Sequence, residues 1–143
     1  MTALAKLSSL EQAYSQAREN FEQIVGYLDS KEASGMTHSE LERELEKKGR
    51  ELMRKLLQEH LNNRGPGQCD PPVEGADGVV RSRMRLQQRE LETVFGTVSV
   101  ERAGYGQQGV ESLHPLDAEL NLPDERYSLE LRRRVAEEAA KSS

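Results

Sequence analysis

Residues 85–105 read RLQQRELETVFGTVSVERAGY, and in this segment the hydrophobic period changes from that of a helix to that of a strand. Within it, polar and apolar residues alternate with period two over Thr97–Arg102, which predicts a strand with one buried face. Phe95-Gly96 lies before this strand, and the glycine supplies the positive φ angle that a tight connection needs. We therefore expect a β-hairpin in which Arg85–Val94 pairs with Thr97–Tyr105.

Two helical segments precede the hairpin. Residues 8–11 (SSLE) and 37–40 (THSE) fit the capping box, in which a hydroxyl and a carboxylate satisfy free backbone donors at a helix start. Apolar residues then recur at three-and-four spacing over Leu10–Leu28 and Leu41–Leu61. Gly49 lies on the second stripe, where a neighbouring helix approaching closely would explain the absence of a side chain. The pattern predicts an antiparallel helical hairpin or a coiled coil shared between chains.

The remaining segments complete the predicted organisation. Residues 62–72 (NNRGPGQCDPP) are rich in glycine and proline and end the helical region. A short helical turn near Leu116–Leu120 and a helix over Ser128–Ala140 follow the β-hairpin. The fold class is therefore predicted as α+β, mainly α. The predicted organisation is a helical hairpin in residues 1–62, a linker in 63–78, and a β-hairpin with a C-terminal helix in 79–143.

Composition limits both the core and the cellular context. Hydrophobic residues are 35% and aromatic residues only 4%, which suits amphipathic helices that complete their core against a partner chain. The single cysteine excludes an intrachain disulfide and is typical of a reducing compartment. We find no signal-peptide pattern at the start and no run of about 18 apolar residues. We expect a cytoplasmic protein without a membrane partner.

Residues with catalytic or metal-binding chemistry are scattered. The histidines and the cysteine lack the close pairing of a metal site, so we interpret them as structural or surface residues: His38, His60, Cys69 and His114. Asp77, Asp117 and Asp124 could hold two divalent metals, but each sits where aspartate commonly caps a helix or forms a turn. No motif places a nucleophile beside a base. We predict no catalytic residue, no metal and no cofactor.

Arginines concentrate around the predicted β-hairpin. Alternate residues of a strand share a face, so one face is expected to carry Arg81, Arg83, Arg85 and Arg89, with Arg102 on the partner strand. Such a face suits contacts with DNA phosphates. The alternative is a solvated edge, partly neutralised by nearby glutamates, whose charge prevents strand aggregation. Arg132 and Arg133 are added as candidate DNA contacts from the C-terminal helix.

The order of motifs resembles the amino-terminal region of ISKra-type insertion-sequence transposases, which are bacterial enzymes of the DDE class. The specific part is residues 93–105 (TVFGTVSVERAGY) followed by residues 114–123 (HPLDAELNLP). Residues 38–45 (HSELEREL) and 56–64 (LLQEHLNNR) agree as well. The resemblance covers about Thr37 to the end of the chain.

This resemblance implies that the full-length relatives continue into a helical DNA-binding segment and an RNase-H-like domain with an acidic triad. None of these catalytic residues falls on a position of this chain, and no catalytic role is implied for Asp77 or Asp117. We therefore expect a non-catalytic part of a transposase, which contacts duplex DNA at transposon ends or forms a homo-oligomer. The alternative is a free-standing protein–protein module that regulates a full-length transposase without touching DNA.

Overall fold

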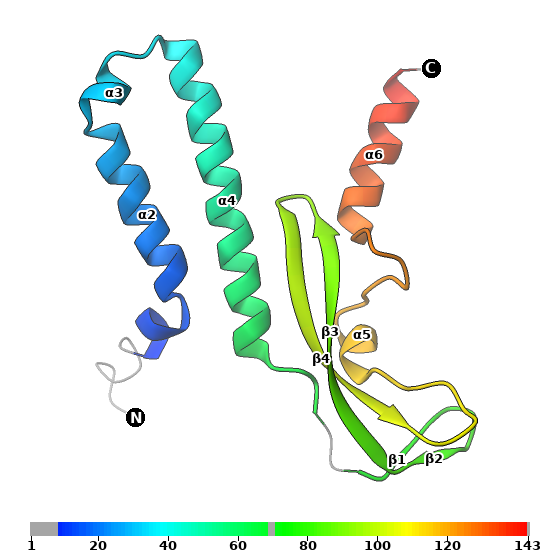
Figure 1. Ribbon diagram of the computed structural model, residues 1–143. Helices are drawn as coiled ribbons and strands as arrows, with labels where there is room; N and C mark the ends of the chain where they lie inside the picture. Colours follow the sequence, from blue (N-terminus) through cyan, green and yellow to red (C-terminus); the bar gives the residue numbers. More distant parts are fainter. Residues whose placement is uncertain (1–8, 69–70, 143) are drawn as a thin grey trace. The chain divides into compact units, whose positions relative to one another are not determined.

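The computed structural model describes residues 9–68 and 71–142. A helical region precedes two small antiparallel sheets and a C-terminal helix (Figure 1). The predicted fold class, α+β and mainly α, is confirmed. The chain divides into two compact units, Met1–Asn63 and Arg64–Ser143. Cys69 and Ser8, the first residue of the predicted capping box at 8–11, lie outside the described residues.

The first unit is a helical hairpin formed by α2 (Ser15–Leu28) and α4 (His38–Arg64). The predicted break between them contains a further short helix, α3 (Lys31–Ser34). The second predicted capping box forms in part. Glu40 N donates to Thr37 Oγ1 at 3.2 Å, whereas the Glu40 carboxylate accepts from that same hydroxyl, at 2.9 Å, instead of from a backbone donor.

The first predicted helix is interrupted at Tyr14, where a turn separates helical residues 9–13 from α2. Glu59 of α4 explains why α2 begins there. Its buried carboxylate accepts hydrogen bonds from Ala17 N at 2.6 Å and Gln16 N at 3.3 Å. An anion at this end satisfies free amide groups and complements the helix dipole. The glutamate thereby joins the two helices through the start of α2.

The second unit is built on the predicted β-hairpin. Strand β3 (Arg83–Thr93) pairs antiparallel with β4 (Gly96–Gly106), and Gly96 has a φ angle of 119°. The predicted pairing is confirmed, and it extends two residues further at the start of β3. β1 (Val73–Glu74) lies within the segment expected to be a linker, and it pairs with β2 (Val80–Arg81), which follows that segment.

Other segments of this unit cover the hairpin. Leu91, Val98 and Val100 are buried on one face, and α5 (Pro115–Glu119) lies against β4. Backbone bonds reach the outer edge of each strand: Tyr105 exchanges two 2.8 Å bonds with Leu113, and Glu92 binds residues 126 and 128. These bonds shorten the free edge on which another strand could pair.

The C-terminal helix, α6 (Leu129–Lys141), starts at Ser128, whose hydroxyl accepts a hydrogen bond from Leu131 N at 3.1 Å. Among the described residues, no helix combines the length and apolar composition that crossing a bilayer requires.

Candidate nucleic-acid interface

The β3–β4 register determines which arginines share a face. Arg83, Arg85 and Arg89 alternate along β3, and their strand partners are Gly106, Gly104 and Val100. Arg102 pairs with Gln87, so it lies on the same face of the hairpin. The predicted common face therefore holds for four of the five hairpin arginines.

Arg81 is the exception, and its prediction as part of that face is wrong. It belongs to β2, and its side chain is only 2% exposed. The guanidinium donates to both carboxylate oxygens of Asp77 at 3.0 and 2.8 Å, and to the Glu111 carbonyl at 3.0 Å. Gly75 makes room for it, because a Cβ there would stand 2.5 Å from Arg81 Nη1. Arg81 therefore holds the β1–β2 turn together and cannot reach a phosphate.

The Arg81–Asp77 pair should make stability depend on pH. Hydrogen bonds from Arg81 and from Val79 N lower the pKa of Asp77 to about 2, against about 3.9 in an unfolded chain. Because the folded pKa is the lower one, the stabilisation is present above about pH 4 and is lost as the pH falls towards 2.

We expect the difference in urea midpoint between wild type and Asp77→Asn to shrink between pH 5 and pH 2. The effect is modest, because half of the Asp77 side chain is exposed and solvent screens the pair. Taking the difference between the two proteins cancels the titration of all other carboxylates. A difference that stays constant over this range would show that Asp77 is not held by Arg81.

Arg89 and Arg102 are occupied by contacts within the unit. Both guanidiniums approach one carboxylate oxygen of Asp117 on α5: Arg102 donates a hydrogen bond to it, and Arg89 Nη1 lies 3.7 Å away. Arg89 also donates to the carbonyls of Pro123 and, at 2.5 Å, Glu125. The Arg89 side chain is 13% exposed. These two arginines fasten α5 and the segment after it to the sheet.

Arg83 and Arg85 are placed differently. Both are exposed, and within the described part of the chain neither forms an ion pair or a hydrogen bond through its side chain. Their strand partners are glycines, so no side chain crosses from β4 to cover them. They line a groove of about 520 Å³ together with Gln87, Gly104, Gly106, Gln107, Gln108 and Ser112. This arrangement offers two cations and several amide and hydroxyl donors on one surface.

His114 lies beside this polar surface, next to Gln87 and Gly104. Its Nε2 lies 2.9 Å from Gln87 Oε1, an amide oxygen that can only accept, so Nε2 carries the proton. Burial lowers the pKa of His114, and the charge of Arg102 lowers it further. The ring is therefore neutral at pH 7, and we assign it a structural role beside Gly104, whose Cβ position is 3.1 Å from Nε2.

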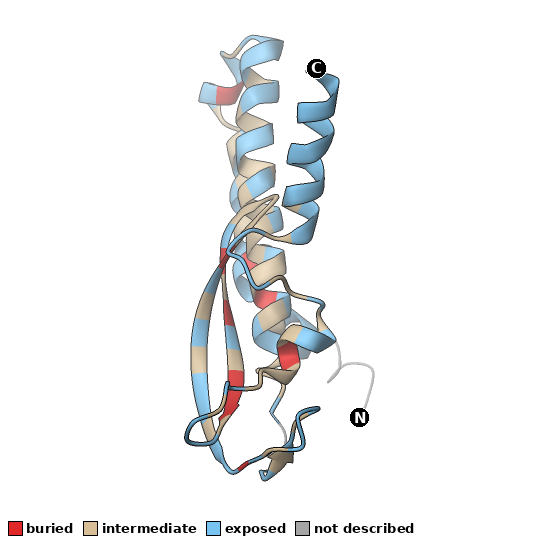
Figure 2. Ribbon diagram, turned by 90° about the vertical axis from the view of Figure 1, so that its right-hand side faces the viewer, coloured by how far each residue is buried: buried red, intermediate tan, exposed pale blue. Residues whose placement is uncertain are grey.

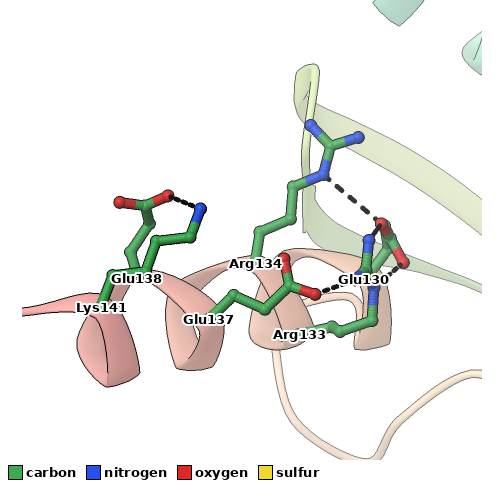
Figure 3. Close-up of polar contacts among 6 residues, drawn as sticks. All are labelled: Glu130, Arg133, Arg134, Glu137, Glu138 and Lys141. Carbon is green, nitrogen blue, oxygen red and sulfur yellow. Dashed lines mark hydrogen bonds and ion pairs between the residues drawn. The ribbon is translucent and has the colours of Figure 1, made fainter.

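The arginines of α6 are exposed but have acidic neighbours (Figure 3). Arg133 binds Glu130 at 2.6 Å and also Glu137, and these contacts raise the pKa of Arg133. Arg132 lies 3.9 Å from Glu125. Exposed pairs of this kind are weak, so a phosphate can compete for either arginine. Their local charge is nevertheless partly neutralised, unlike that of Arg83 and Arg85.

No three His, Cys, Asp or Glu side chains lie together as metal ligands would, within residues 9–68 and 71–142. Asp77 and Asp117 each bind arginine instead. The sequence analysis did not predict the groove lined by Gly104, Gly106 and Ser112. The pattern that could have indicated it is a pair of glycines on one strand opposite alternating arginines on the other.

The chain matches no family model, no curated protein and no solved structure.

Proposed function

We propose that this chain is a non-catalytic amino-terminal part of a DNA transposase that binds the backbone of transposon DNA and self-associates. The observation that carries the DNA-binding part is the pair Arg83 and Arg85, exposed beside bare glycine backbone without an acidic partner among the described residues. The resemblance of residues 93–105 and 114–123 to motifs of ISKra-type transposases supports the choice of DNA as the ligand. A protein with this role works in the cytoplasm.

The chemistry of the groove favours phosphate over an acidic peptide or a base edge. Two guanidiniums two residues apart on a strand lie about 7 Å from each other, and each can bind phosphate oxygens in bidentate fashion. Gln87, Gln107 and Ser112 add neutral donors, which suit phosphate and sugar oxygens. Contacts of this type position a protein on a duplex without reading its sequence.

The proposal predicts weak, salt-dependent binding to duplex DNA that requires the groove. Replacing Arg83 and Arg85 together with Gln is expected to weaken binding roughly 100-fold, because two charge-assisted hydrogen-bonding groups are lost. It should also reduce the slope of log K against log salt by about 2, one unit for each phosphate contact. Fluorescence anisotropy with a labelled duplex between 50 and 200 mM salt measures both quantities.

The matched control is Arg18→Gln with Arg43→Gln, which removes two arginines from the helical unit and leaves the groove intact. Its affinity and its salt slope should stay close to those of wild type. If wild type fails to bind duplex at low salt, or if both double variants lose affinity equally, the groove is not a DNA site. The alternative of a protein–protein module without DNA contact would then be favoured by the exposed apolar residues of the helical unit.

A further inference from the structure

The helical unit has almost no apolar core of its own. Its buried apolar residues, within the described range 9–63, are two alanines, Ala17 and Ala33. Every leucine, isoleucine, phenylalanine and methionine described in this unit remains at least partly exposed (Figure 2). Helix pairs are stabilised mainly by packing of their apolar faces, so this pair leaves most of that stabilisation unused.

The large exposed apolar side chains of α2 and α4 lie on one side of the hairpin. Contacts between the helices involve Ala17 with Glu59 and Tyr27 with Lys48, whose Nζ is 4.2 Å from the ring centre. Helical spacing from these contacts turns Asn20 and Ile24 of α2, and Leu52 and Lys55 of α4, towards the partner helix as well. Because the helices are antiparallel, the residues one position after each of these turn towards the same side of the pair. Those positions carry the exposed residues that we call the open face: Phe21, Val25, Leu28, Met53 and Leu56.

Gly49 belongs to the same side, since it follows Lys48 on α4. A Cβ at this position would meet no atom within 4 Å in this chain. The close approach of a helix that the sequence suggested for Gly49 therefore does not come from α2. The glycine leaves a shallow gap in the open face, one turn before Met53, that a side chain from another molecule can fill.

We propose that a second copy of this chain covers the open face, so that two helical hairpins form a four-helix bundle. In this arrangement the two-fold axis runs parallel to the helices, and α2 of each copy packs on α4 of the other. This proposal rests on the self-association part of the proposed function and is independent of DNA binding.

The area of the open face fits a dimer. Its five side chains are between 37% and 52% exposed. That exposure leaves on the order of 400 Å² of apolar surface on each copy, which is within the size range of patches that mark interaction sites. A stable interface buries about 800 Å² per partner, of which a little more than half is apolar. The open face supplies this apolar share, and the polar residues around it supply the rim.

Register and charge select the packing of α2 on α4. The Ala17–Glu59 and Tyr27–Lys48 contacts place Val25 of α2 between the heights of Gly49 and Met53 on α4, so rotation about a parallel axis brings Val25 of one copy opposite this part of α4 in the other without a shift. Packing α4 on α4 would instead oppose two basic segments. Each segment holds one carboxylate, Glu51, and five cations: Lys47, Lys48, Arg50, Arg54 and Lys55. Helix α2 carries two carboxylates, Glu19 and Glu22, and one guanidinium, Arg18.

Sedimentation equilibrium of the full chain tests the face. Wild type is expected to be a dimer at 10 to 100 μM, and Val25→Glu or Met53→Glu a monomer, with the dimer dissociation constant raised at least about 100-fold. Both residues are 45% exposed in the single chain, so a charge there is compatible with the folded hairpin. Circular dichroism at equal concentration shows whether the variants keep their helices.

The matched control is Gln23→Glu, which adds the same charge to α2 two residues away, roughly on the opposite side of the helix. This variant should remain dimeric. A monomeric wild type would overturn both this inference and the self-association part of the proposed function. A dimer that survives Val25→Glu and Met53→Glu would overturn the open face alone, and duplex affinity of the same samples reports DNA binding separately.

Cysteine cross-linking tests the packing of the helices. In a Cys69→Ser background, Val25→Cys and Met53→Cys are prepared as separate proteins and mixed. A disulfide dimer is expected in the mixture and not in either protein alone, because α2 of one copy meets α4 of the other. Cross-linking of Val25→Cys with itself would place α2 on α2 and contradict the proposed axis.

Discussion

The Asp117→Asn variant is expected to lower the stability of the unit Arg64–Ser143 by roughly 3 kcal/mol, because removing one partner of a largely buried ion pair leaves uncompensated charge. Here two guanidiniums, those of Arg89 and Arg102, approach a single carboxylate oxygen. Both side chains are less than 20% exposed, so water replaces the lost anion poorly. The substitution preserves size and shape, and the loss therefore reports charge and hydrogen bonding.

The second carboxylate oxygen makes the amide a poor substitute in either orientation. Asp117 Oδ1 and Arg102 Nε are both buried without a hydrogen-bond partner in the part of the chain that the structure describes. If the asparagine turns its NH₂ group towards the arginines, donors face donors. If it presents its oxygen to them, the buried NH₂ group finds no acceptor and keeps a desolvation cost.

Hydrogen exchange of the β3 and β4 amides measures this loss in the correct unit, whereas a global melting curve mixes two units. Exchange of the strand amides should accelerate about 100-fold. Asp124→Asn is the matched control, since Asp124 is an exposed carboxylate in the same region. Equal protection in wild type and Asp117→Asn would mean that the two arginines do not depend on this anion.

The features that sequence predicts well are those formed by neighbouring residues. The hydrogen bond from Glu40 N to the Thr37 hydroxyl joins residues three positions apart and forms as the spacing indicates. The hairpin around Gly96 follows from alternation on both sides of a turn. Each depends on local geometry, which a pattern of residue types contains. The interruption at Tyr14 does not, because Glu59 acts on it from 42 residues away along the chain.

The arginines show the same limit within one motif. Alternation correctly predicts that Arg85, Arg89 and Arg102 share a face, yet only Arg85 is free to meet a ligand. The difference arises because α5 covers the part of the face nearer the hairpin turn, and it carries Asp117 there. Arg81 does not lie on the predicted face, because it belongs to the short strand β2. That strand pairs with β1, and Arg81 binds Asp77 in the turn between them. No alternation pattern encodes which carboxylate folds over which guanidinium.

Leu116→Ala is expected to destabilise the same unit by about 2 to 5 kcal/mol, the usual cost of truncating a well-packed leucine. Leu116 is 2% exposed and contacts the backbone of Gly67, where a Cβ would stand 2.9 Å from Leu116 Cβ. Gly67 has a φ angle of 69°, so its backbone is held in a conformation that leaves this space open.

The position of Leu116 extends its effect to the candidate interface. It precedes Asp117 on a five-residue helix, so loosening α5 also loosens the anion that holds Arg89 and Arg102. Hydrogen exchange should therefore accelerate at β4 and at the amides of residues 120–122, which bond to α5. Leu86→Ala is the matched control: Leu86 is 54% exposed on β3, and its truncation should cost less than about 1 kcal/mol. Equal losses for the two leucines would mean that α5 does not anchor this sheet.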